Sequence, residues 1–190
     1  DAYLRRQDFL PMTQEDRERS KIIYAASDFA VSKDDMANRT SLTVGGKCPQ
    51  NLLHIVDQRV DRWATLELIH DLSKHPGWNF LEDPRGRGYY VGWIVEMIFI
   101  QRRWSPEYFF VEDGVIWKAI KTMFWNTCQE FDCPINIVEI PSIKDKATRG
   151  RSFQKRHRSG MMRFDKQTEW YLGYEAECLR FTGSAQALLD

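Results

Sequence analysis

The sequence lacks several features that would place it in a familiar functional class. Its longest apolar stretch, YYVGWIVEMIFI at 89–100, is interrupted by Glu96 and is too short to span a bilayer. There is no visible secretory signal peptide and no G-x-x-x-x-G-K-S/T loop of the kind that binds nucleotide phosphates. These absences argue against a membrane protein, a secreted protein and a P-loop ATPase.

Cysteines are few, and their spacing does not fit a zinc site. None of the four forms a C-x-x-C pair, and no cysteine and histidine cluster has zinc-ligand spacing. We therefore predict reduced and mostly buried thiols in a cytosolic protein, with a Cys128–Cys133 disulfide as the less favoured alternative.

The chain has no net charge but concentrates positive charge in one place. It contains 27 basic and 27 acidic residues, yet RGRSFQKRHRSG at 149–160 holds no acid. A solvated helix usually mixes both signs, so this run favours contact with a nucleic-acid backbone over a plain surface helix. The candidate DNA-binding residues are Lys144, Lys146, Arg149, Arg151, Lys155, Arg156 and Arg158.

Hydrophobic periodicity predicts a mixed α/β domain after a polar arm or linker at 1–20. We expect a meander of strands at 21–27, 40–46 and 51–60, with a turn at Gly45-Gly46. Helices are expected at 61–75, 89–104, 115–131 and 168–181, and strands at 107–113, 135–140 and 161–164. This order predicts a ribonuclease H-like mixed β-sheet of about five core strands with helices on both faces.

Acids follow two of the predicted core strands. Asp28 ends the first strand, and Glu112 and Asp113 end the strand at 107–113. Chemistry in α/β sheets sits beyond the carboxyl ends of strands, and neighbouring strands lie about 4.8 Å apart. Two carboxylates that close repel each other unless a proton or cation lies between them. The pattern predicts a two-metal Mg²⁺ or Mn²⁺ site for phosphodiester hydrolysis.

Structural roles for the same acids remain open. Asp28 could begin a turn, and Asp113 is a candidate N-cap for the helix at 115–131. Because side chains alternate along a strand, we expect Glu112 to be the ligand and Asp113 the cap. Asp34 and Asp35 follow shortly after Asp28, and we consider Asp34 a further candidate ligand.

Aromatic and histidine residues near the carboxyl end favour packing roles. Trp170, Tyr171 and Tyr174 have helical spacing, which favours a core face over a base-stacking platform. His157 lies in the basic run, where we expect a phosphate contact or no role in preference to proton transfer.

Three segments taken in order resemble a known family. They are IIYAASDFAVSKDDMANRTSLTVGG, YFFVEDGVIWKAI, and the basic segment that leads into MMRF and the last helix. Over most of 20–190 they resemble the C-terminal nuclease domain of the terminase large subunit of tailed bacteriophages, a member of the ribonuclease H-like superfamily. By this resemblance, residues 1–20 are a linker from an ATPase domain and residues 21–190 form the nuclease domain.

The resemblance implies roles for individual acids. Asp28 matches the first catalytic acid, Glu112 the second and Asp34 an accessory acid of some members. Asp190 would begin the acidic motif that supplies the third catalytic acid. The implied activity is metal-dependent endonuclease cleavage of double-stranded viral DNA concatemers during genome packaging.

The resemblance also implies partners. They are double-stranded DNA, an ATPase domain, the small terminase subunit and the portal, in the cytoplasm of an infected bacterial host. The segment at 76–106 is longer than the family pattern leads us to expect. Two alternatives stay open: a ribonuclease H-like resolvase or hybrid nuclease, and a non-catalytic DNA-binding or docking module.

Overall fold

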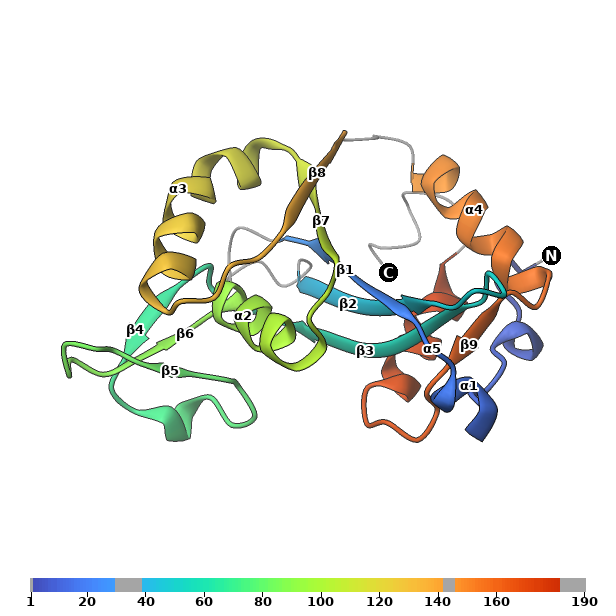
Figure 1. Cartoon of the computed structure of the whole chain (residues 1–190), viewed down its shortest axis with the longest axis horizontal. Coiled ribbons are helices and arrows are strands. Elements are labelled where there is room, and N and C mark those ends of the chain that lie inside the picture. Colours follow the sequence, from blue (N-terminus) through green and yellow to red (C-terminus); the bar gives the residue numbers. More distant parts are fainter. Residues whose placement is uncertain (1, 30–38, 142–145, 182–190) are drawn as a thin grey trace. The chain divides into compact units, whose positions relative to one another are not determined.

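The computed structural model describes residues 2–29, 39–141 and 146–181, with the backbone alone for 146–149 (Figure 1). A six-stranded sheet has the order β8-β7-β1-β2-β3-β9, and a smaller sheet has the order β4-β6-β5. The strands are β1 (Ile22–Asp28), β2 (Thr40–Lys47), β3 (Leu53–Asp61), β4 (Glu67–Ile69), β5 (Leu81–Glu82), β6 (Tyr89–Val91), β7 (Tyr108–Asp113), β8 (Ile137–Pro141) and β9 (Met162–Phe164). The predicted ribonuclease H-like class is confirmed, although the sheet has six strands because β9 pairs in parallel with β3.

The helices are α1 (Gln14–Glu18), α2 (Trp93–Trp104), α3 (Val115–Glu130), α4 (Lys146–Arg158) and α5 (Tyr171–Arg180). Two short 3-10 turns cover Arg6–Asp8 and Leu72–Lys74. Within the described ranges, none of these helices has the length and apolar character needed to cross a membrane.

The chain divides into two compact units. One contains Asp1–Tyr24, Thr43–Arg59 and Ser142–Asp190, and the other contains Ala25–Leu42 and Val60–Pro141. The boundary passes through β1, β2 and β3, so these strands contribute residues to both units.

The second unit is built around α2, which is buried along most of its length. Trp93, Ile94 and Val95 are fully buried, as are Met97 and Ile98 one turn later. Burial on all sides explains why this stretch reads as an almost continuous apolar run. Its single acid, Glu96, is 1% exposed and accepts hydrogen bonds from the backbone N–H (2.9 Å) and side-chain amide (2.7 Å) of Asn79. The buried carboxylate therefore ties the segment before β5 to this helix.

The helix predicted at 61–75 is wrong. The segment instead forms the end of β3, strand β4 and a 3-10 turn. Ile69 pairs with Tyr89 of β6, and the carbonyls of Ala64 and Thr65 accept the N–H groups of Trp93 (3.0 Å) and Ile94 (3.2 Å). The first turn of a helix has unpaired N–H groups, so these carbonyls satisfy α2 instead of a local helix. Tertiary pairing thus outweighs a weak local propensity.

The turn predicted at Gly45-Gly46 is also wrong, since both glycines lie inside β2. The chain turns later, where Asn51 adopts a φ of 63° and its N–H reaches the Cys48 carbonyl at 2.9 Å. A Cβ on Gly46 would lie 2.9 Å from Cδ of Lys21. The glycine is therefore explained by a close approach within the strand.

Residues 2–20 pack into the core of the first unit. Leu4 and Phe9 are 3% and 2% exposed. They join a cluster that also contains Ile55, Met162, Phe164 and Tyr171, with Trp170 and Tyr174 packed against it. The predicted core role of the carboxyl-terminal aromatic residues is confirmed.

The predicted state of the thiols is confirmed as well. All four cysteines are free, and three of them are buried: Cys48, Cys128 and Cys133. Burial raises the pKa of the Cys128 thiol to about 12, so this side chain is protonated at neutral pH.

Candidate active site and nucleic-acid interface

Asp28 and Glu112 lie on neighbouring strands of the large sheet. Asp28 is the last residue of β1, and Glu112 is the last but one of β7. The Ser27 hydroxyl donates to the Phe110 carbonyl at 3.4 Å, which places these strand ends beside each other.

Aromatic stacking shows that β1 and β7 end at the same edge. The ring of Phe29, one residue beyond β1, stacks on Trp93 with a centroid distance of 4.1 Å. Phe29 also stacks on Trp117 at 6.2 Å, and Trp117 lies in the first turn of α3, directly after β7. The two acids that the sequence singled out therefore both lie at this edge.

The Glu112 carboxylate faces the turn that leads into α3. Its Oε1 atom is 3.8 Å from the position that a Cβ on Gly114 would occupy, and the Gly114 N–H donates to the Glu112 carbonyl at 2.9 Å. Asp28 is exposed and Glu112 is partly buried. A phosphodiester backbone can therefore approach these side chains from solvent.

The predicted capping role of Asp113 is wrong. Gly114 occupies the N-cap position of α3, without a side-chain cap. Asp113 is still extended in β7, in register with Pro141, and its Oδ1 lies 3.8 Å from Nζ of Lys118. It therefore pairs with a cation one turn into the helix instead of capping its first N–H groups.

A further acid on this part of the sheet was not singled out in the sequence. Glu139 of β8 is in register with Val111 and accepts a hydrogen bond from Nε1 of Trp117 at 2.9 Å. It also pairs with Lys121, and these two hydrogen bonds, that of Lys121 first, lower its pKa. Nothing in INIVEI distinguishes a structural acid from a ligand, and these contacts assign Glu139 a structural role.

The metal site was predicted to draw on four acids. Two of them, Asp34 and Asp190, lie outside the described residues. Among the residues that are described, no group of three histidine, cysteine, aspartate or glutamate side chains gathers as a metal site. Asp28 and Glu112 offer the hard oxygen donors that Mg²⁺ and Mn²⁺ prefer, so the donor chemistry fits even though the described set is partial.

The basic segment forms α4 and the turn after it. Lys144 lies outside the described residues, and only the backbone is described for Lys146 and Arg149. Arg156 donates to the carbonyl and the side-chain oxygen of Asn51 at 3.1 and 3.3 Å, and Arg158 donates to the Ala2 carbonyl at 3.1 Å.

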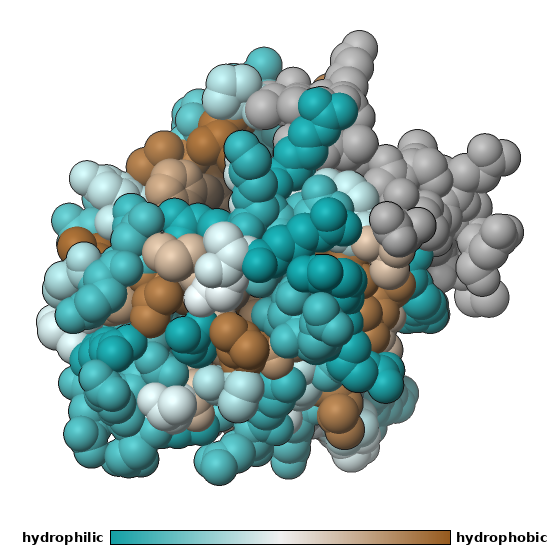
Figure 2. All heavy atoms as spheres, turned by 90° about the vertical axis from the view of Figure 1, so that its right-hand side faces the viewer, coloured by the Kyte–Doolittle hydropathy of each residue, from teal (hydrophilic) through white to brown (hydrophobic). Residues whose placement is uncertain are grey.

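Two cations of α4 remain exposed. The side chains of Arg151 and Lys155 make no hydrogen bond or ion pair with the described part of the chain, and they lie four residues apart on one helix face. The side of the molecule that carries α4 is mostly hydrophilic (Figure 2). This pair is therefore the part of the predicted DNA-binding set that is most available to a phosphate backbone.

The phosphate contact considered for His157 is wrong. The side chain is 1% exposed and packs against the rings of Phe9 and Phe153, each at a centroid distance of 4.5 Å. Burial lowers its pKa to about 4, so the ring is neutral at pH 7. The histidine belongs to the core, which its basic neighbours in the sequence do not reveal.

The described fold is similar to that of solved viral terminases. The large terminase of bacteriophage HK97 is 10% identical over 87% of this chain and 34% of that chain, with a TM-score of 0.50. The large terminase of a thermophilic bacteriophage, in complex with ADP, is 12% identical over 89% of this chain and 34% of that chain, at 0.47. The human cytomegalovirus terminase nuclease domain, Mn soaked and inhibitor bound, is 12% identical over 87% and 75%, also at 0.47.

Sequence comparisons add nothing to this likeness, since neither a protein-family model nor a curated protein matches the chain. The chain spans about a third of the length of the two phage large terminases. At the level of the fold, the predicted resemblance is confirmed: the chain shares its fold with the matched part of the HK97 large terminase.

Proposed function

We propose that the chain is a metal-dependent endonuclease that cuts double-stranded DNA. The observation that carries this proposal is the pairing of Asp28 and Glu112 at the ends of adjacent strands, on a fold shared with a large terminase. Two Mg²⁺ or Mn²⁺ ions at such a site would activate the attacking water and stabilise the leaving oxygen. Asp34 and Asp190 complete the proposed ligand set.

The residues of the chain prepare this site in three ways. The carboxylates of Asp28 and Glu112 concentrate negative charge that a divalent cation neutralises. Phe29 stacked on Trp93 holds the end of β1 in place. Asp113, paired with Lys118, keeps its charge away from the proposed ligands.

The proposed substrate is the concatemeric DNA of a virus during genome packaging. The proposed partners are an ATPase domain joined through residues 1–20, the small terminase subunit and the portal. The basic residues of 144–158 would hold the phosphate backbone without reading bases, because electrostatic contacts carry no direct sequence information.

The first test is cleavage of a supercoiled plasmid. We expect nicked and linear products with Mn²⁺ or Mg²⁺ and intact plasmid with EDTA, because the carboxylates act only through the cation. Salt-sensitive DNA binding without any cleavage would favour the docking module instead. Faster cleavage of a four-way junction or an RNA·DNA hybrid than of plain duplex would favour the resolvase or hybrid nuclease.

A second prediction concerns the exposed face of α4. Replacing both Arg151 and Lys155 with alanine should lower the slope of log affinity against log salt by about 1.8, since each lost phosphate contact removes about 0.9. The measurement is fluorescence anisotropy with a short duplex at several salt concentrations. As a control, Arg156→Gln should leave the slope nearly unchanged, because that guanidinium is held by Asn51. An equal effect of both variants would contradict this division of roles.

A further inference from the structure

Helix α4 has little packing surface of its own. It spans 13 residues, and His157 is its one buried side chain among those described, with Phe153 and Gln154 partly covered. An isolated helix of this length is marginal in water. What α4 packs against therefore determines whether it is ordered.

The amino-terminal arm supplies much of that packing. Gln154 donates its side-chain amide to the Tyr3 carbonyl at 2.7 Å, and Arg158 donates to the Ala2 carbonyl at 3.1 Å. The Tyr3 ring covers Gly150 so closely that a Cβ there would lie 2.5 Å from the Tyr3 hydroxyl.

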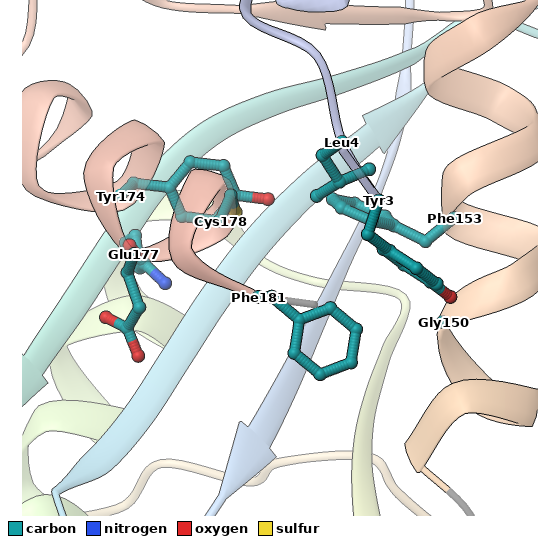
Figure 3. Close-up of a pocket in the computed structure, with 9 residues that line it drawn as sticks. Tyr3, Leu4, Gly150, Phe153, Tyr174, Glu177, Cys178 and Phe181 are labelled. Atoms are coloured by element: carbon teal, nitrogen blue, oxygen red, sulfur yellow. The ribbon is translucent and has the colours of Figure 1, made fainter. Parts of the chain in front are cut away.

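The contact is open on one side (Figure 3). Tyr3 and Leu4 of the arm, Phe153 of α4 and Phe181 after α5 line a pocket of about 230 Å³. Tyr3 and Phe181 meet edge to face at 4.8 Å. Since Tyr3 forms one wall of this pocket, loss of its ring would leave α4 uncovered next to a space that is already empty of side chains.

Helical spacing connects the arm to the exposed cations. Gly150, Gln154 and Arg158 are four residues apart and form one stripe along α4, which faces the arm. Arg151 and Lys155 each follow one residue later and form the next stripe. The arm therefore fixes the rotation of the helix about its axis, and with it the direction of these two cations.

We propose that arm residues 2–4 are positioning residues for DNA binding: they hold α4 in the orientation that presents Arg151 and Lys155 to the phosphate backbone. This inference rests on the proposed function of α4. It assigns a role in substrate binding to a segment whose sequence predicts only a polar linker.

The test uses Tyr3→Ala and Gln154→Ala in the full chain. We expect about fivefold weaker duplex binding for Tyr3→Ala and about threefold for Gln154→Ala. Alanine is the better helix former, so a gain in helix propensity at 154 would change binding in the opposite direction. Backbone amides of α4 should exchange with solvent about tenfold faster in both variants, because the helix loses its cover.

Thr13→Ala is the matched control. Thr13 caps α1 in the same arm and has no contact with α4 among its hydrogen bonds, so the variant should keep duplex binding within about twofold. Unchanged binding and exchange in both test variants would overturn the proposal. If the unaltered chain failed to bind DNA, the proposed function would fall, while the exchange of α4 would still decide whether the arm orders it.

Discussion

Replacing Asp28 with asparagine is expected to abolish metal-dependent cleavage, by about a hundredfold or more, and to leave duplex binding unchanged. Asparagine keeps the shape of the side chain but removes the charge that a divalent cation needs. The measurement is the nicking rate of supercoiled plasmid with Mn²⁺, together with duplex anisotropy in EDTA. Glu112→Gln should show the same loss.

Asp113→Asn provides a matched control for this prediction. It makes the same chemical change one residue beyond Glu112, at a carboxylate that pairs with Lys118. We expect this variant to retain its nicking rate within about threefold. Cleavage that survives in Asp28→Asn would remove Asp28 from the proposed site, and equal losses in both aspartate variants would indicate a general structural effect.

Acidification is expected to destabilise the protein strongly between pH 6.5 and about 4. His54 and His157 are 0% and 1% exposed, and burial is the main cause that lowers the pKa of each to about 4, with Lys21 adding to the effect at His54. The unfolded chain, with histidines near 6.5, takes up protons first as the pH falls. The free energy of unfolding is therefore highest above pH 6.5 and falls by up to about 3 kcal/mol per histidine on the way to pH 4.

Urea unfolding at a series of pH values measures this loss. His157→Phe should remove about half of it, because a phenyl ring suits the cluster of Phe9, Phe153 and Phe164 and takes up no proton. His70→Asn is the control, since this histidine is exposed. A free energy of unfolding that stays constant down to pH 4 would show that neither ring is held neutral by the fold.

The sequence predicted the sheet well because its strands are apolar runs that end in charged residues. Asp28 and Glu112 could be placed at neighbouring strand ends since the order of elements restricts the topology. The segment at 61–75 could not be read in the same way. Its apolar spacing is helical, but the carbonyls of Ala64 and Thr65 serve the first turn of α2.

Roles set by single contacts were out of reach of sequence patterns. Asp113 looks like a cap until its extended backbone and its distance to Lys118 are known. His157 and Arg156 belong to one basic run, yet one is buried and the other is bound to Asn51. Periodicity identifies a helix here, but long-range contacts decide which of its charges remain available.

The edges of the large sheet affect how the protein behaves at high concentration. An edge strand with unpaired backbone groups invites pairing with another chain. At β9 the arm uses the backbone groups of Phe164, whose N–H donates to Leu10 and whose carbonyl accepts from Met12, both at 2.9 Å. At the other edge, β8 ends at Pro141, which has no N–H to offer. The residues that cover β9 therefore also protect the protein against edge-to-edge aggregation, and a chain trimmed before Met12 would lose that protection.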